Sequence, residues 1–258
     1  MSSIEYRLDQ WSKIYKFLLV DPHVYVGKES NCRLFMEAIL WIVRSGAQWR
    51  LLPKEYGLWN SVYKRFSRWE EQGVWERMFT HFSKDTDLEN VSIDSSVIRA
   101  HPCSAGAQKK EEQEISEAQT EQALGRSKGG FTTKIHAAVD ALGNPIRLSL
   151  TPGQSHDILQ ARPLIEGLEA QAVLADKAYD ADQFLNFLRE KGILIVIPQK
   201  KNRIEKRDYD FFRYRERHLI ECFFNKIKHF RRVFSRFDKI AKKYLAFLQF
   251  VSTLIWLR

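Results

Sequence analysis

The sequence predicts an α/β fold, in which a mixed sheet with flanking helices follows a small all-α N-terminal domain. Up to about Asn90 the apolar residues follow helical spacing and tryptophan is frequent. Short apolar runs bounded by turn residues begin after that point, and the later ones alternate with helical segments. Such alternation indicates a sheet covered by helices on both faces. We therefore expect a helical domain at 1–88 and an α/β domain at 89–258.

Two helices are predicted in the N-terminal domain. The first runs from about Cys32 to Arg44, with Asn31 as its cap and Gly46 at its end. The second runs from about Trp59 to Glu71, and three of its basic residues lie away from its buried stripe: Lys64, Arg65 and Arg68. A helix, a turn and a basic helix are compatible with a helix-turn-helix DNA reader, although any small helical bundle gives a similar pattern.

The elements after residue 90 are predicted from apolar runs and the turns between them. Strands are expected at 91–98, 131–140, 146–150, 172–175 and 193–197. The second and third form a hairpin across a turn at 142–145, with Asp140 as a turn residue. Helices are expected at 156–168 and 182–191, with Asp157 and Asp182 as their caps. The polar segment 105–130 is interpreted as an exposed loop.

One helix near the C-terminus carries an unusual row of side chains, formed by Tyr214, Arg217, Glu221 and Lys228. At 100° per residue they fall within roughly 60° of one helix face. The strand-borne Asp94 and Asp176 are the acids that could join Glu221, if their strands are neighbours and the helix packs across the sheet. An exposed helix face with an Arg217–Glu221 ion pair is the alternative interpretation.

Three carboxylates in a basic protein suggest a metal site that acts on phosphodiesters. Mg²⁺ prefers oxygen ligands, and two such ions can activate the attacking group and stabilise the leaving oxygen. We expect Asp94 to bridge both ions, with Asp176 on one and Glu221 on the other, and Mn²⁺ to substitute. The same face offers Arg217 and Lys228 for phosphate contacts, and Tyr214 for base stacking or a phosphate hydrogen bond.

Charge and cysteine usage narrow the class of protein. The formal net charge is +9, and residues 199–243 alone hold 16 Lys/Arg against 6 Asp/Glu. A basic segment of this kind most often faces a polyanion, although a solvated basic surface remains possible. Three cysteines without a paired spacing indicate a reducing compartment. The longest uncharged stretch, 244–257, is too short to span a bilayer, so we expect a cytoplasmic protein and a core-packing helix there.

These residues resemble bacterial insertion-sequence transposases of the DDE type, whose catalytic domain is RNase H-like. That family carries the pattern Y-x2-R-x3-E-x6-K, which the four residues of the basic helix fit at every spacing. Further stretches typical of the family lie at 45–53, 91–96, 125–136, 150–157 and 174–180. One departure is Ala178, where the family usually has glycine. The loop at 105–124 also varies widely between members.

The resemblance implies an enzyme that cuts DNA at the terminal inverted repeats of a mobile element and joins the 3′ ends to target DNA. It also implies a homodimer or higher assembly on double-stranded DNA, associated with the bacterial nucleoid. The pattern for a nucleotide-binding loop is absent, so no nucleotide cofactor is expected. Two alternatives remain: a metal-dependent nuclease on the same fold, and a non-catalytic DNA-binding repressor or domesticated copy. The intact acidic triad argues against the second.

Overall fold

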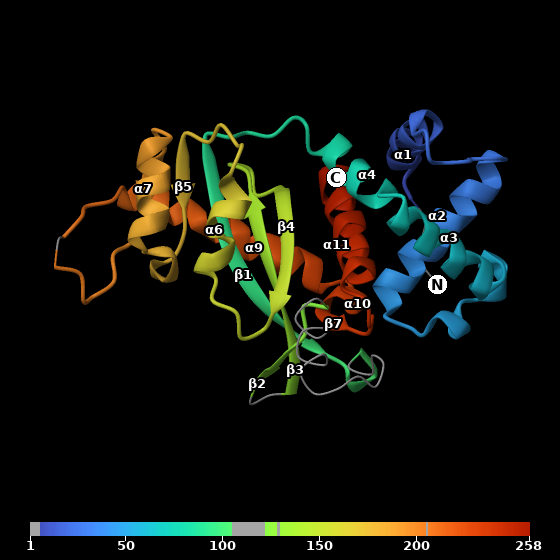
Figure 1. The fold of residues 1–258 in the computed structure, drawn as a ribbon. Helices are drawn as coiled ribbons and strands as arrows, with labels where there is room; N and C mark the ends of the chain where they lie inside the picture. The colour runs from blue at the N-terminus through green and yellow to red at the C-terminus, as the bar shows by residue number, and fades with distance from the viewer. Residues whose placement is uncertain (1–5, 105–121, 128–129, 205) are drawn as a thin grey trace.

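The computed structural model describes residues 6–104, 122–127, 130–204 and 206–258. Their centre is a mixed sheet of seven strands in the described residues. Its strands are β1 (Asn90–Ala100), β2 (Gly125–Ser127), β3 (Gly130–Val139), β4 (Pro145–Pro152), β5 (Ala172–Leu174), β6 (Leu194–Val196) and β7 (Ser235–Arg236). The predicted α/β class, an RNase H-like mixed sheet preceded by helices, is confirmed (Figure 1).

The sheet has an antiparallel half and a parallel half, which meet at β1. On one side β1 pairs antiparallel with β3, and β3 pairs antiparallel with β2 and β4. On the other side β5 lies parallel to β1, and β6 lies parallel to β5. The predicted hairpin is confirmed, and Asp140 stabilises its turn by accepting hydrogen bonds from the backbone amides of Leu142 and Asn144. β1 is therefore the one long strand that borders both halves.

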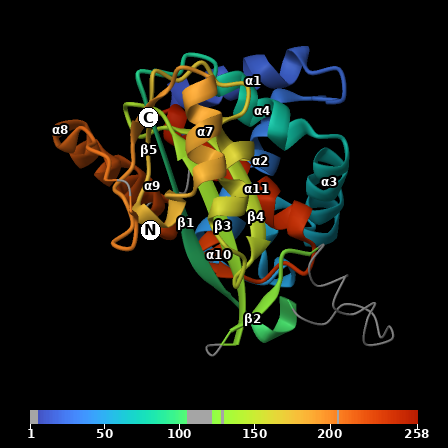
Figure 2. The same cartoon turned by 60° about the vertical axis from the view of Figure 1, so that its left-hand side comes forward.

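Helices cover both faces of this sheet, as Figure 2 shows for α6 and α7 on the near face. The helices that follow the hairpin are α6 (Ile158–Ile165), α7 (Asp182–Glu190), α8 (Phe211–Tyr214), α9 (His218–Lys228), α10 (Arg231–Phe234) and α11 (Ala241–Trp256). Ile93 and Ala138 face α6 and α7 in one apolar cluster. Their strand neighbours Ile135 and Ala137 pack with α9 and α11 in the other cluster. Because side chains alternate along a strand, β1 and β3 contribute to both layers.

The N-terminal helices are α1 (Leu8–Val20), α2 (Glu29–Ser45), α3 (Trp59–Glu71) and α4 (Val74–Phe82). They pack beside α11, which lies between them and β4 (Figure 1). The stacked rings of Phe66 and Phe247, 4.4 Å apart, form part of this contact. α11 is the core-packing helix expected at 244–257. Across the described ranges, no helix combines the length and the hydropathy needed to cross a membrane.

Two local predictions are wrong. α2 begins at Glu29, so Asn31 lies inside its first turn and Lys28 occupies the cap position. An acidic first turn favours this earlier start, since Glu29 lies at the positive end of the helix dipole. β2 lies within the segment interpreted as a loop; a strand of three residues held by backbone pairing carries no alternation to reveal it. Residues 105–121 and 128–129 of that loop lie outside the described residues.

Candidate active site

The two strand aspartates lie at the same end of the parallel pair β1–β5. The ladder between these strands runs from Asn90–Ala172 to Ser92–Leu174. Asp94 and Asp176 each follow the last pair by two residues, so equal registers bring them to the same level of the sheet. The two strands are therefore neighbours, which is the condition for the two aspartates to converge.

A tight turn fixes the backbone at Asp176. This residue caps the short helix η4 (Lys177–Tyr179), and its Oδ1 accepts a hydrogen bond from the Ala178 amide at 2.8 Å. Ala178 is not among the described residues with positive φ, so its methyl group causes no backbone strain. The departure from glycine at this position is compatible with the local geometry.

Arg217 connects two of the three predicted acidic residues. It lies in η5 (Arg215–Arg217), the short turn that joins α8 to α9. Its Nη1 donates to Asp94 Oδ2 at 2.8 Å, and its Nη2 donates to Glu221 Oε1. The bond to Glu221 follows from the i,i+4 spacing, whereas the bond to Asp94 spans 123 residues. The guanidinium thus joins β1 to the start of α9.

The surroundings of Asp94 disfavour its charged form. Burial raises the pKa of Asp94, and the negative charges of Asp176 and Asp157 act in the same direction, against Arg217 and a backbone amide. Burial acts to lower the pKa of Arg217, but the carboxylates of Asp94 and Glu221 outweigh it and raise that pKa. The site therefore holds acidic groups whose mutual repulsion an added cation would relieve.

The other two residues of the basic row lie on either side of this contact. Tyr214 is half-buried at the end of α8, where its ring meets Tyr209 edge-on at 5.3 Å and packs against the small apolar cluster of β5 and β6. The Arg217 guanidinium lies 6.0 Å from the centre of the Tyr214 ring. Lys228 is half-buried at the far end of α9. The row predicted from helical spacing is thus divided among α8, η5 and α9.

The donor chemistry of the site fits a divalent ion. Asp94, Asp176 and Glu221 offer carboxylate oxygens from three separate elements, which is the ligand type that magnesium prefers. Within the part of the chain that the structure describes, no three acidic, histidine or cysteine groups lie close enough to hold one ion in common. The guanidinium of Arg217 supplies positive charge between Asp94 and Glu221 instead. Arg217 is thus bonded to one oxygen of Asp94 and to one oxygen of Glu221.

A polar cluster on the α6 side of β1 was missed by the sequence reasoning. Asp157 occupies the cap position of α6, but its side chain makes no capping hydrogen bond, so its interpretation as a cap is wrong. Its Oδ1 instead accepts from Ser95 Oγ and pairs with Lys134 Nζ, each at 2.8 Å. His136 Nδ1 lies 3.9 Å from the same oxygen. The resemblance of the stretch 150–157 to the family is the sequence signal that points to Asp157.

The interpretation of Asp182 as a cap is also wrong. Asp182 is the first residue of α7, and its carboxylate accepts from Arg203 Nη1 at 2.6 Å. Arg203 also donates to the buried Asp180 at 2.7 Å, and Arg207 pairs with Asp180 at 3.4 Å. These ion pairs fasten the segment after β6 to the turn that carries Asp176.

With this geometry described, the comparisons with known proteins identify the family. Residues 86–247 match the family described as "Transposase DDE domain". The chain belongs to the DDE transposases. Residues 7–79 match a second family, described as "Putative transposase of IS4/5 family". The predicted resemblance to bacterial insertion-sequence transposases is thereby confirmed, and the family consists of enzymes that cut nucleic acid.

Individual proteins are also similar to this chain. The chain is 41% identical over 130 residues to a putative transposase for insertion sequence element IS6501 of Brucella ovis, covering 50% of this chain and 100% of the relative. It is 28% identical over 135 residues to a putative transposase for IS402 of Burkholderia cepacia, covering 48% and 62%. A piggyBac transposase in a synaptic complex with hairpin DNA gives a TM-score of 0.40 at 12% identity, covering 80% of this chain and 51% of that one.

The basic residues of α3 in this transposase differ in their surroundings. Lys64 and Arg68 are exposed, whereas Arg65 is half-buried. The Arg65 guanidinium lies 4.4 Å from the Phe35 ring centre and 5.0 Å from that of Trp69. All three basic residues line a groove of about 610 Å³ between α3 and the loop that follows α1, together with other polar side chains that include His23, Lys28 and Asn31. This groove is the strongest candidate for an N-terminal DNA contact.

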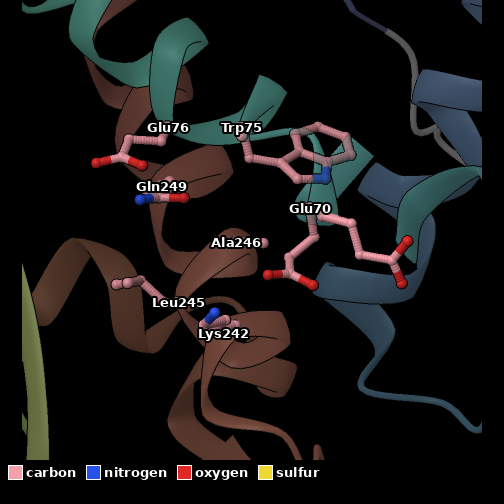
Figure 3. A pocket seen from close by; sticks show the side chains of 9 residues that line it. Glu70, Trp75, Glu76, Lys242, Leu245, Ala246 and Gln249 are labelled. Atoms are coloured by element: carbon pink, nitrogen blue, oxygen red, sulfur yellow. The ribbon is translucent and has the colours of Figure 1, made fainter. Parts of the chain in front are cut away.

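A second hollow of the helical region has the opposite character. It measures about 490 Å³ and lies where α3 and α4 meet α11 (Figure 3). Glu70, Glu71 and Glu76 line it, with Lys242 on the α11 side. Burial raises the pKa of Glu70, against the lowering effect of Lys242 and the neighbouring lysine. Three glutamates make this hollow a poor site for a polyanion. The groove lined by Lys64, Arg65 and Arg68 is the better candidate for DNA contact.

Proposed function

We propose that this chain is the transposase of an insertion sequence, which cuts DNA at the terminal inverted repeats and joins the 3′ ends to target DNA. Membership of the DDE transposases supports the reaction class. The chemistry is assigned to the site around Asp94, Asp176 and Glu221. Association with the bacterial nucleoid, expected from the sequence, is part of the same proposal.

The observation that carries the proposal is the contact of Arg217 with both Asp94 and Glu221. An exposed Arg217–Glu221 pair on its own would stabilise a helix by only about 0.2–0.5 kcal/mol and would need no strand carboxylate. The second bond, to the partly buried Asp94, joins the helix to the strand edge that also bears Asp176. The intact set of three carboxylates beside a basic helix favours a catalytic role over that of a protein that only binds DNA.

Each residue has a distinct part in the proposed reaction. The residues that would hold magnesium are Asp94, Asp176 and Glu221. Two such ions, when bound, stabilise the charge that develops on the attacking and leaving oxygens of a phosphodiester. Once released from Asp94, Arg217 can donate to two oxygens of one phosphate. Lys228 offers a point charge further along α9, and Tyr214 offers a phenol for a phosphate or a base.

DNA contact extends in this proposal to the N-terminal helices. Lys64 and Arg68 are exposed on α3 beside the groove that includes Lys28. Basic side chains along one groove neutralise phosphates without reading base sequence. We further propose that two or more protomers assemble on the DNA, since cutting at both ends of an element and joining them to one target requires paired active sites.

The test is a cleavage and joining assay on a defined substrate. Sequencing the DNA on both sides of the gene supplies the element ends, which are placed on a supercoiled plasmid with a labelled target DNA and Mg²⁺. Asp94→Asn, Asp176→Asn and Glu221→Gln are each expected to lose cleavage while folding and DNA binding persist. Asp208→Asn, an exposed carboxylate of the basic segment, is the matched control and should remain active.

The products separate the proposal from its alternatives. Labelled target DNA covalently joined to element ends supports a transposase. Nicked or hydrolysed DNA without joining would indicate a nuclease on the same fold. Cleavage that persists in any one of the three acidic variants would remove that residue from the catalytic set. Specific binding with no cleavage by the unaltered protein would indicate a repressor.

A further inference from the structure

Asp157 binds the sheet instead of the helix that it begins. Its Oδ1 accepts a hydrogen bond from Ser95 Oγ at 2.8 Å and pairs with Lys134 Nζ at the same distance. Lys134 also donates to the Ser155 carbonyl at 2.7 Å, so the lysine is held from two sides. The side chains of Asp157 and Lys134 are 25% and 11% exposed. The ion pair is therefore largely sheltered from solvent. With Ser95 it connects β1, β3 and the start of α6.

The alternation of β1 places this cluster directly behind Asp94. Ser95 lies opposite His136 across the β1–β3 ladder, on the layer that α6 covers. Asp94 lies opposite Ala137, which packs in the layer of α9. The Ser95 backbone amide nevertheless donates to Asp94 Oδ1 at 2.7 Å. Ser95 is therefore bonded to Asp157 through its side chain and to Asp94 through its backbone.

The cluster is not an arrangement that folding alone would favour. His136 Nδ1 and the Tyr179 hydroxyl, both buried in this layer, have no hydrogen-bond partner within the described residues. Unpaired buried polar atoms are destabilising, and a sheltered ion pair often contributes little net stability. Such departures from local consistency concentrate at functional sites.

We infer that Asp157 is a positioning residue for Asp94, acting through Ser95. By holding the Ser95 hydroxyl, the carboxylate fixes the rotation of β1 at this point and with it the amide that orients Asp94 Oδ1. Lys134 keeps the Asp157 carboxylate in place. This inference rests on the proposed function, in which Asp94 is a metal ligand. Partners behind a ligand commonly determine how well that ligand is oriented.

The test measures Mn²⁺ binding to the full chain without DNA, by titration with electron paramagnetic resonance detection. Asp157→Ala is expected to weaken binding about tenfold or more, within the range for removing a residue that orients a ligand. Asp157→Asn keeps an acceptor for Ser95 and should weaken binding less. Ser95→Ala should weaken binding as well. The double variant Asp157→Ala/Ser95→Ala should bind Mn²⁺ no more weakly than the single variant with the lower affinity. Both substitutions break the same connection, from Asp157 through Ser95 to Asp94.

The controls distinguish failure of this inference from failure of the proposed function. Glu166→Ala removes a carboxylate that pairs with Arg162 at the other end of α6, and it should leave Mn²⁺ affinity unchanged. If Asp94→Asn leaves Mn²⁺ binding intact, the proposed function fails at its metal site. If Asp94→Asn abolishes binding but Asp157→Ala and Ser95→Ala do not weaken it, positioning is overturned. Additive losses in the double variant would overturn the route through Ser95.

Discussion

At the residue scale, Tyr179 and Tyr244 are both fully buried tyrosines with different surroundings. The Tyr244 hydroxyl donates to the Val233 carbonyl at 2.7 Å. The Tyr179 hydroxyl has no partner within the described residues. Burial raises the pKa of both phenols, so both remain protonated at neutral pH. The pair allows the contribution of a buried hydrogen bond to be compared within one protein.

We expect Tyr244→Phe and Tyr179→Phe to affect stability differently. Tyr244→Phe leaves the Val233 carbonyl unpaired and should lower the free energy of unfolding by about 1–2 kcal/mol. Tyr179→Phe removes a hydroxyl that makes no bond, so the free energy of unfolding should stay equal or rise by up to ~1 kcal/mol. Urea unfolding followed by circular dichroism measures both. Equal losses would mean that the Tyr179 hydroxyl has a bonding partner in solution.

His136 should make the protein sensitive to mild acid. Burial lowers its pKa from 6.5 to about 4, with Asp157 opposing and Lys134 assisting this shift. Between these two values the unfolded chain binds a proton that the folded chain does not, so stability is lost as pH falls. The loss attributable to His136 should reach about 3 kcal/mol near pH 4. Urea unfolding of His136→Gln should lack this part of the pH dependence; parallel curves for both proteins would contradict it.

The sequence could predict residue contacts within one helix but not those between elements. The Arg217–Glu221 pair follows from a spacing of four residues. The bond from Arg217 to Asp94 depends on how α9 crosses the sheet, which no local pattern contains. The same holds for Asp157, whose position before a helix suggested a cap. Its actual partners lie on strands 62 and 23 residues away in sequence, and their approach is a product of the whole fold.

At the scale of elements, the basic residues of α3 differ in role: Lys64 and Arg68 are exposed, whereas Arg65 packs on aromatic rings. We expect Lys64→Ala and Arg68→Ala each to weaken DNA binding and to reduce the salt dependence by about one phosphate contact. Arg65→Ala should instead lower stability by about 1–2 kcal/mol, because its guanidinium packs on Phe35 and Trp69. Filter binding over a salt series and thermal unfolding separate the two effects, with exposed Lys16→Ala as the control.

The sequence predicts the ends of helices correctly where a particular residue type marks the end, such as a glycine. α3 has the predicted limits, and Gly46 ends α2 in the left-handed conformation with φ of 66°. The start of α2 was predicted too late because Asn31 is a favoured cap residue, yet the helix extends past it. The break of the basic helix into α8, η5 and α9 leaves helical backbone angles throughout, so periodicity alone could not reveal it.

At the scale of the whole molecule, a single apolar cluster runs through both predicted domains. It includes Trp11 and Phe66 from the helical region, Ile135 from the sheet, and Phe247 from α11. Rings of Trp49, Phe66 and Trp75 meet Phe247 or its neighbours on α11. The division at 88/89 stays a prediction, but the shared core leads us to expect that the two parts unfold together.

Phe247→Ala tests that expectation. Removal of a buried ring at this position should lower the free energy of unfolding by about 3–5 kcal/mol. Both tryptophan fluorescence, dominated by the helical region, and far-ultraviolet circular dichroism should report the same transition midpoint, before and after the substitution. Two separate midpoints in the unaltered protein would show that the helical domain is independently stable. Leu245→Ala, a partly buried neighbour, provides a milder control.

The position of α11 also bears on the order in which the chain is made. A ribosome releases the end of α4 roughly 160 residues before it releases the start of α11, the helix that packs on α3 and α4. During that interval the faces of Phe66 and Trp75 have no permanent cover, so they depend on chaperones or on transient collapse. A premature stop codon before residue 241 would leave those faces uncovered permanently. Genes interrupted in this way should therefore yield aggregation-prone or degraded fragments in place of a stable DNA-binding fragment that could compete with intact copies.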